Sequence, residues 1–483
     1  MLNLILLLAI STGLVFALRR CLYPHLCYLN ITIILSIKIT ATVLFYMVYS
    51  NYYGKGELTE DAGAYYQEAK ILKTVFIESP SDYWQIIFAS HDKENLITKA
   101  FESKPFARFA PNGWANFETR NFIGLCSALL LITPDSPWSL FIVFGTLTLI
   151  ILLVLISQIK NYTGITTRLC LILVFAPNVL FWSSGLLKES ILFIGFALVL
   201  MGFVIEKANY KVIAIAMGST LLLFFKPIIG IMLLVSYLLV LAWRIFIKHK
   251  LIAGISYILI IVSLCWSQFP NHILREISDK QYDFVNVGKG GYHFEWEEGF
   301  LYAPLSDSSL FQKQDSLFVP KYKTPLVFNS RKKEAKSSVL FVNPTDTLHL
   351  AHLLIGGRSY FPLKLIDNKF SNLLISIPES LLNFFFRPFP FDKVHSLQKA
   401  ILLIENLIIF GLFIFLIIRL FKSQKQESYL LTTIIFVLIA GTVIGLITPV
   451  SGALVRYRMP VQLFILFSFL LNFSKNEPNK TID

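Results

Sequence analysis

Long apolar runs are the sequence feature that most restricts the fold of this chain. The runs are rich in Leu, Ile and Phe, and none of them alternates apolar and polar residues as a barrel strand does. Several are shorter than the roughly 20 residues that a perpendicular membrane helix needs, so their boundaries are soft. The candidate spans are residues 2–18, 28–49, 138–159, 167–184, 190–206, 211–225, 228–244, 251–267, 398–419, 429–448 and 457–473. The sequence therefore predicts an all-α polytopic membrane protein with about 11 transmembrane helices.

The composition supports a membrane location and argues against a nucleic-acid-binding protein. Hydrophobic residues make up 55% of the chain and charged residues only 15%, yet the formal net charge is +13. The basic residues fall mainly between apolar runs, where the positive-inside rule places them. The positive net charge is therefore explained by the membrane topology and does not indicate nucleic-acid binding. The five cysteines show no metal-binding or redox spacing. No Walker loop or nucleophile elbow occurs, which argues against an ATP-driven pump or a serine hydrolase.

The short basic loops agree on one orientation. If the N-terminus lies outside, all of these loops fall on one and the same side of the membrane. The positive-inside rule then identifies the side with the basic loops as the cytoplasmic side. The loops carry Arg19 and Arg20, Lys160 and Arg168, Lys207 and Lys211, Arg244 with Lys248 and Lys250, Arg419 with Lys422 and Lys425, and Lys475 and Lys480.

Two long segments then lie on the extracytoplasmic side. The first contains amphipathic pieces such as 81–88, which predict juxtamembrane helices, and the apolar run 122–133, which is too short to span. The second is mixed in charge and rich in Pro, Gly and aromatic residues, which predicts a small mixed outer segment. The predicted organisation is two transmembrane helices in 1–49, an outer loop in 50–137, a six-helix core in 138–267, an outer segment in 268–397, and three helices with a cytoplasmic tail in 398–483.

Carboxylates stand beside membrane spans at two places. Glu60 and Asp61 open a predicted helix after the second span, and Asp61 shares one helix face with Tyr65. Lys188 and Glu189 lie between two strongly apolar runs, where an ionisable pair is expensive and points to function. The alternatives are an N-terminal helix cap at the first place and an ordinary solvated turn at the second.

Basic residues on the predicted outer side form a second candidate set. Arg456 and Arg458 oppose the positive-inside trend there, and guanidinium groups suit a phosphate; lipid headgroup binding is the alternative. Lys226 breaks another apolar stretch at the same face, and Arg387 is a weaker candidate. Within the second span, Lys38 needs a partner, for which Glu405 is a structural candidate.

These acidic and basic motifs together resemble the GT-C superfamily of polytopic glycosyltransferases, particularly bacterial relatives of the protein mannosyltransferase and aminoarabinose transferase group. The resemblance matches Asp61, with Glu60, to the family's first acidic motif and Glu189 to its second. The stretch Arg456-Tyr457-Arg458-Met459-Pro460 is similar to one near the C-terminus of many bacterial members. The chain departs from the family in its extra N-terminal span and in Glu-Asp-Ala at the first motif. The choice between Glu60 and Asp61, and any need for a divalent metal, therefore stays open.

The resemblance implies a sugar transfer from a polyprenyl-phosphate-linked donor to a glycan, lipid or protein acceptor, in the cytoplasmic membrane of a bacterium. Asp61 would act as general base, while Lys188, Arg456 and Arg458, joined by Lys226, would stabilise the donor phosphate. No cofactor is specified, and no metal ligand is assigned. A polysaccharide polymerase or ligase using undecaprenyl-linked substrates is one alternative. A lipid or polysaccharide transporter is another, and it should show inverted repeats and interrupted helices near the midplane.

Overall fold

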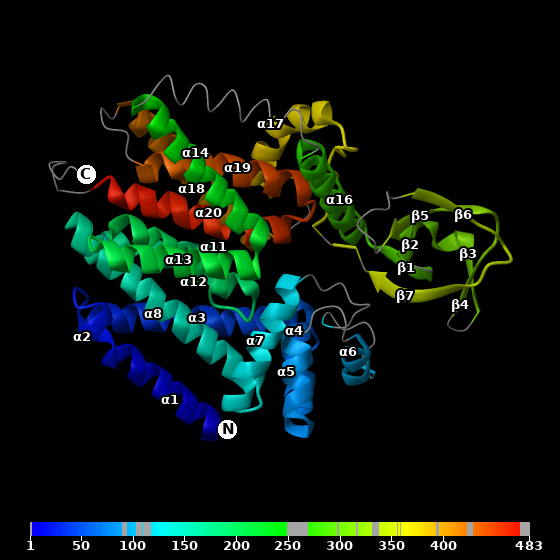
Figure 1. Ribbon diagram of the computed structural model, residues 1–483, viewed down its shortest axis with the longest axis horizontal. Helices are drawn as coiled ribbons and strands as arrows, with labels where there is room; N and C mark the ends of the chain where they lie inside the picture. Colours follow the sequence, from blue (N-terminus) through cyan, green and yellow to red (C-terminus); the bar gives the residue numbers. More distant parts are fainter. Residues whose placement is uncertain are drawn as a thin grey trace. The chain divides into compact units, whose positions relative to one another are not determined.

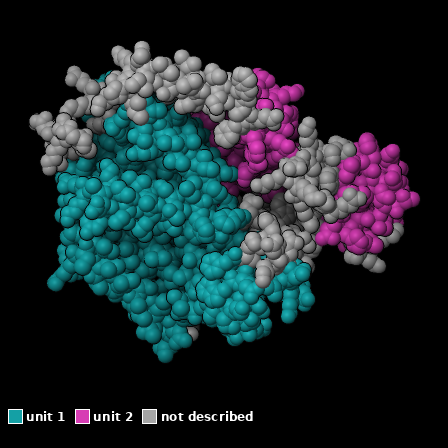
Figure 2. All heavy atoms as spheres, in the orientation of Figure 1, with its two compact units in different colours: residues 1–244, 408–440, 458–483 teal, residues 245–407, 441–457 magenta. Residues whose placement is uncertain are grey.

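The computed structural model describes most of the chain in two compact units (Figures 1 and 2). The described residues are 2–88, 94–102, 109, 117–248, 269–296, 299–314, 317–330, 338–354, 356–357, 359–392, 396–422 and 428–473. The first unit comprises residues 1–244, 408–440 and 458–483, and the second comprises residues 245–407 and 441–457.

Long apolar helices confirm that this is a multi-pass membrane protein. Among the described residues, 8 helical stretches are long and apolar enough to cross a membrane, and each corresponds to a predicted span. The stretches are Leu2–Leu22, Tyr28–Tyr52, Pro137–Thr163, Ala208–Phe225, Pro227–Arg244, Lys399–Lys422, Ser428–Ile447 and Ser451–Leu471. The corresponding elements are α1 (Leu2–Ala17) with α2 (Arg19–Leu22), α3 (Tyr28–Met47) with the π-helical turn η1 (Val48–Tyr52), α8 (Pro137–Thr163), α13 (Ala208–Phe225), α14 (Pro227–Lys248), α18 (Ser396–Lys422), α19 (Ser428–Ile447) and α20 (Ser451–Leu471).

The three remaining predicted spans have different outcomes. The run 251–267 lies outside the described residues. The run 190–206 corresponds to α12 (Lys188–Val204), a short helix buried on almost every side and packed against α8 and α13. The prediction of one continuous helix over 167–184 is wrong, because this stretch is divided into α9 (Thr167–Cys170), α10 (Ile172–Phe175) and α11 (Pro177–Trp182).

Proline explains the interruption before α11. Ala176 has an extended backbone, with ψ 107°. A residue that precedes proline avoids the helical region, because the proline ring clashes with its backbone, and Pro177 itself has no N–H to donate to the preceding turn. Pro177 is well placed at the first position of a new helix, so the chain stops and restarts there.

Hydrogen bonds in the first unit bring two of the basic loops together. Lys160, near the end of α8, donates from Nζ to the carbonyl of His25 at 2.7 Å. Arg19 donates from Nε to the carbonyl of Leu26 at 2.8 Å, which closes the turn between α2 and α3. The two loops lie side by side, as an assignment of both to one face of the membrane requires.

The first predicted outer loop is helical and packs on its own core. It contains α4 (Glu60–Glu78), α5 (Pro80–Phe88), α6 (Glu94–Ala100) and α7 (Phe117–Ile132). The ring of Tyr65 on α4 lies 5.0 Å from that of Phe122 on α7, and Tyr83 on α5 shares a 2.9 Å hydrogen bond with Ser127 on α7. Phe45 of α3 belongs to the same buried cluster, so this helical layer is joined to the spans of the first unit.

The second unit contains a β-sheet that the sequence did not predict. After α16 (Phe269–Lys289), seven strands form an entirely antiparallel sheet in the order β3-β4-β7-β1-β2-β5-β6. The strands are β1 (Gly291–Trp296), β2 (Gly299–Pro304), β3 (Phe311–Gln314), β4 (Leu317–Pro320), β5 (Thr324–Ser330), β6 (Ser338–Val342) and β7 (Leu348–Leu354). Their core contains Phe294, Leu301 and Leu348. The sheet is followed by the apolar helix α17 (Phe370–Phe386).

Candidate functional site

The turn before α12 places Lys188 and Glu189 in the first turn of a buried helix. Leu187 is extended and precedes the helix, and Glu189 is favoured there because the helix dipole stabilises a carboxylate near its N-terminus. A Cβ atom on Gly185 would lie 2.3 Å from the ring of Phe45 on α3, so only glycine allows the turn to approach this closely. The turn therefore packs directly on α3, and the two charged residues that follow it, Lys188 and Glu189, are buried.

Two ion pairs connect this turn to neighbouring helices of the first unit. Lys188 Nζ lies 3.2 Å from Glu118 Oε1 and 3.2 Å from the hydroxyl of Thr119, both on α7. Lys226, which separates α13 from α14, places its Nζ 3.5 Å from Glu189 Oε1. We call Glu118, Lys188, Glu189 and Lys226 the paired cluster. Its four charges come from α7, α12 and the α13–α14 turn, and they are equally divided between positive and negative.

In the paired cluster, Lys188 and Lys226 are less available to bind a phosphate than the sequence suggested. The side chain of Glu189 is 1% exposed and that of Lys226 is 14% exposed, so their attraction is only weakly screened. Both lysines are engaged by carboxylates, and a phosphate would have to compete with Glu118 and Glu189 for them. Glu118 was not among the predicted site residues. Its position in Phe117-Glu118-Thr119-Arg120-Asn121, directly before an apolar run, is the sequence signal that identifies it.

The predicted base lies at the start of α4. Asp61 is half-buried and Glu60 is exposed, with Glu60 in the left-handed region at φ 54°. The loop before them is held by Thr59, which donates from its backbone N and from its hydroxyl to the carbonyl of Tyr49 at 3.3 and 2.9 Å. A Cβ atom on Gly63 would lie 2.1 Å from the carbonyl oxygen of Leu58, so this glycine lets the loop fold back onto the helix.

Packing of α4 on α7 places the two acidic helices side by side, since α7 also carries Glu118. Glu68, on the same face as Asp61, is 1% exposed and accepts a 2.8 Å hydrogen bond from the backbone N of Phe109. Glu68 therefore ties the backbone of Phe109 to α4. Asp61 differs from Glu68 because it keeps partial exposure at the helix start.

The two C-terminal arginines lie inside a helix rather than before one. Helix α20 begins at Ser451, six residues earlier than the predicted span, so Arg456 and Arg458 occupy its second and third turns. Side chains two positions apart on an α-helix project from different faces, so the pair does not form a single two-pronged clamp. Arg458 belongs to the first unit and is 2% exposed, whereas Arg456 belongs to the second. The convergence of Lys188, Arg456 and Arg458 on one polar cavity, with Asp61 and Glu189 opening onto it, stays a prediction.

Lys38 has a partner other than the one the sequence suggested. Its Nζ donates to the carbonyl of Ser183 at 2.9 Å and to the Ser183 hydroxyl at 2.7 Å. Ser183 is the C-cap of α11, where the negative end of the helix dipole favours a cation. Lys38 thus ties the middle of α3 to the end of the interrupted span, just before the turn that carries Lys188. Glu405 belongs to the second unit.

In the second unit, Arg387 is held on all sides by its own neighbours. Its guanidinium lies 3.6 Å from the ring centroid of Phe361, and its NH1 contacts both carboxylate oxygens of Asp392 at 3.0 and 3.1 Å. Its Nε donates to Asn383 Oδ1 at 2.8 Å. Burial lowers the pKa of Arg387, and the carboxylate of Asp392 opposes that shift. These contacts assign Arg387 a structural role at the end of α17.

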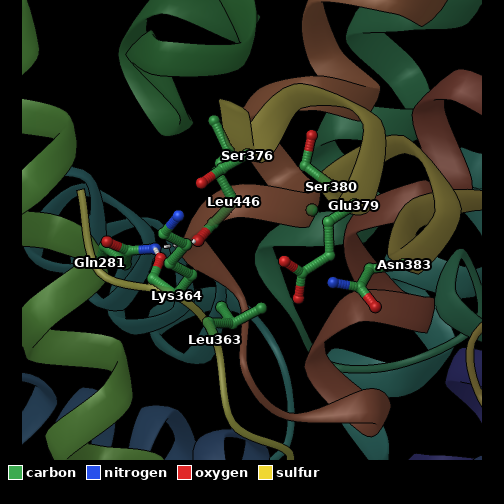
Figure 3. A pocket seen from close by; sticks show the side chains of 9 residues that line it. Gln281, Leu363, Lys364, Ser376, Glu379, Ser380, Asn383 and Leu446 are labelled. Atoms are coloured by element: carbon green, nitrogen blue, oxygen red, sulfur yellow. Dashed lines mark hydrogen bonds between the residues drawn. The ribbon is translucent and has the colours of Figure 1, made fainter. Parts of the chain in front are cut away.

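A small polar cavity of the second unit lies between α16, α17 and the end of α19 (Figure 3). Its volume open to a water-sized sphere is about 10 Å³, which is room for about one water molecule. Ser376, Glu379, Ser380 and Asn383 line it from one face of α17. The side chain of Gln281 closes it and donates to the carbonyls of Lys364 and Leu446 at 3.0 and 2.8 Å.

Helix α16, which carries Gln281, also carries the carboxyl group of Asp283. Burial raises the pKa of Asp283 to about 6, the neighbouring Asp279 adds to that rise, and Lys280 opposes it. Burial also raises the pKa of Asp279, one turn earlier on α16.

Neither a metal-binding group nor a similar known protein indicates which reaction the site supports. Among the residues that the structure describes, no group of three or more His, Cys, Asp or Glu side chains could hold a metal ion. Comparison with protein-family models, curated proteins and solved structures finds no match to this chain.

Proposed function

We propose that this protein is a membrane glycosyltransferase of the GT-C type, which moves a sugar from a polyprenyl-phosphate-linked donor to an acceptor at the extracytoplasmic membrane face. The observation that carries the proposal is the paired cluster, in which four charges from three separate elements meet beside the turn that joins α13 and α14, two of the candidate spans. Intramembrane or near-membrane ionisable residues are costly and are usually kept for function. The half-buried Asp61 stands on α4, which packs on the helix that bears Glu118.

The chemistry assigned to these residues balances in a single displacement. The acceptor hydroxyl oxygen attacks the anomeric carbon of the sugar, and the bond between that carbon and the donor phosphate oxygen breaks. The polyprenyl phosphate leaves with the bonding electrons, and the hydroxyl proton passes to the carboxylate of Asp61. Lys188 and Lys226 would stabilise the phosphate by exchanging part of their contact with Glu118 and Glu189 for contact with the leaving group.

The direct test is sugar transfer by the purified protein in lipid nanodiscs. The assay supplies polyprenyl-phosphate-linked sugars with a panel of glycan, lipid and peptide acceptors, and it measures release of polyprenyl phosphate. Asp61→Asn should lower turnover by about 10²–10⁴-fold, the usual contribution of a general base, while the variant still inserts and binds the donor. Glu68→Gln is a matched control, since Glu68 lies on the same helix as Asp61 and its carboxylate accepts a hydrogen bond from the backbone N of Phe109. Wild-type turnover in the Asp61→Asn variant would remove Asp61 from the mechanism.

A transporter is the second candidate, and the interrupted span favours it. Transporters use broken helices whose ends and unwound backbone face a substrate near the midplane. Here α9, α10 and α11 replace one continuous helix, and the end of α11 accepts hydrogen bonds from Lys38 in the middle of a span. Counterflow of a labelled polyprenyl-linked glycan across proteoliposomes, without release of polyprenyl phosphate, would support this alternative. A polymerase or ligase would instead lengthen a glycan acceptor in the nanodisc assay.

A further inference from the structure

Helix α17 buries three polar side chains and exposes four large apolar ones. Ser376, Ser380 and Asn383 are 4%, 2% and 2% exposed, and they share one helix face at spacings of four and three residues. Figure 3 shows these side chains, with Glu379, along the face that lines the polar cavity. A surface helix of a water-soluble domain has the opposite arrangement, with the apolar stripe turned inward.

The outward face of α17 is strongly apolar. Phe370, Leu374, Ile375 and Leu382 are 62%, 50%, 62% and 54% exposed, and they lie on the side away from the polar stripe. Leaving four large apolar side chains in water would forgo about 1.5–3 kcal/mol for each one. Pro378, inside the helix, is also on the exposed side, and membrane helices tolerate such prolines better than soluble ones do.

The inner face of α17 touches a membrane helix at close range. A Cβ atom on Gly445 would lie 2.0 Å from the carbonyl oxygen of Ser380, and one on Gly441 would lie 2.9 Å from the ring of Phe384. Gly441 and Gly445 form a Gly-x-x-x-Gly pair in the last turns of α19, which is one of the candidate spans. Small residues at this spacing allow the close backbone approach that is typical of helix packing within a bilayer.

We propose that α17 is embedded in the membrane, with its outward face covered by lipid acyl chains and its polar stripe facing a hydrated cavity. The acyl chains are the occupant that the observations favour, because α17 packs through its opposite face on α19, a helix long and apolar enough to span the membrane. At 17 residues, α17 is about 26 Å long, so it enters the hydrocarbon without crossing it as a perpendicular helix would. This revises the assignment of all of 268–397 to the aqueous outer side.

Nitroxide accessibility tests the proposal directly. Ile375→Cys and Phe341→Cys are made separately in a chain whose five cysteines are replaced by alanine, spin-labelled, and reconstituted in phosphatidylcholine vesicles. The two residues are matched in exposure, at 62% and 60%, but Phe341 lies on β6 of the sheet. We expect oxygen, which concentrates in hydrocarbon, to relax the label at 375 more than a water-soluble nickel complex does, and the reverse at 341.

Each other outcome contradicts the proposal in a distinct way. A label at 375 that responds mainly to the nickel complex would place α17 in water. A label shielded from both reagents would mean that a second copy of the chain or another protein covers the face. If the cysteine-free chain does not fold, benzoylphenylalanine in place of Ile375 in the native chain replaces the spin label. Irradiation should then yield a phospholipid adduct, and a protein-only adduct would overturn the proposal. None of these readouts depends on glycosyl transfer.

Discussion

Removing either partner of the Glu189–Lys226 pair should destabilise the first unit far more than removing an exposed ion pair does. Lys226→Met leaves the carboxylate of Glu189 in a region where its side chain is 1% exposed, and Glu189→Gln leaves the ammonium of Lys226 at 14% exposure. At 3.5 Å, two unit charges attract by about 5 kcal/mol in a medium of effective dielectric constant near 20. Desolvation offsets much of this attraction in the intact pair, and each single variant loses the attraction while the remaining charge keeps its desolvation cost.

A double-mutant cycle on Glu189 and Lys226 measures the coupling energy between these two side chains. Breaking a buried pair by removing one partner costs about 3–5 kcal/mol, because an uncompensated charge stays behind. The double variant Glu189→Gln/Lys226→Met removes both charges, so it should be little worse than either single variant. The coupling energy between the two residues should therefore be close to the cost of one single variant, about 3–5 kcal/mol.

Lys70 and Asp135 provide a matched control in the same unit. Their charged atoms are 3.7 Å apart, nearly the distance in the Glu189–Lys226 pair, but their side chains are 51% and 40% exposed. An exposed pair of this kind contributes below about 1 kcal/mol. Unfolding is followed by tryptophan fluorescence as the mole fraction of sodium dodecyl sulfate rises in mixed micelles. Equal coupling energies for the two pairs would refute the argument that burial strengthens the Glu189–Lys226 attraction. The buried pair would then contribute no more to stability than the exposed one.

Three further predictions test the topology, the loop geometry and the electrostatics. Lys70→Cys should react with a membrane-impermeant thiol reagent in intact cells and Lys207→Cys only after permeabilisation, because the basic loops mark the cytoplasmic side; the opposite pattern would invert the topology. Gly63→Ala should lower glycosyl transfer, since its Cβ would meet the carbonyl of Leu58 at 2.1 Å and displace Asp61, whereas Gly13→Ala, with open space around it, should leave transfer unchanged. The stability of the second unit should fall by up to about 3 kcal/mol as pH rises from about 4 to about 6, because the folded state retains the proton of Asp283, whose pKa is about 6 against 3.8 in the unfolded chain. Asp283→Asn should remove that slope in chemical unfolding, and an unchanged slope would assign it to other groups.

The amino-acid sequence is enough to predict the membrane character, the approximate spans and the places where charge accumulates. Hydrocarbon imposes a one-dimensional rule on a chain, because each span must satisfy its backbone within a run of about 20 apolar residues. For that reason eight spans were located correctly, and Lys188, Glu189 and Lys226 were recognised as exceptional beside apolar runs.

The contacts that those charged residues make could not be predicted from the sequence, because they depend on how the helices pack. Glu118 is 70 residues from Lys188 in sequence, and no local pattern joins them; the pair exists because the tertiary structure brings the start of α7 beside the start of α12. Pro177 predicts either a kink or a break, and the structure shows that the chain stops at the extended Ala176 and restarts as α11, whose end accepts hydrogen bonds from Lys38. The reversed faces of α17 became visible only once Gly441 and Gly445 showed which side is covered, because hydrophobic periodicity locates an apolar stripe without telling whether protein or lipid lies against it.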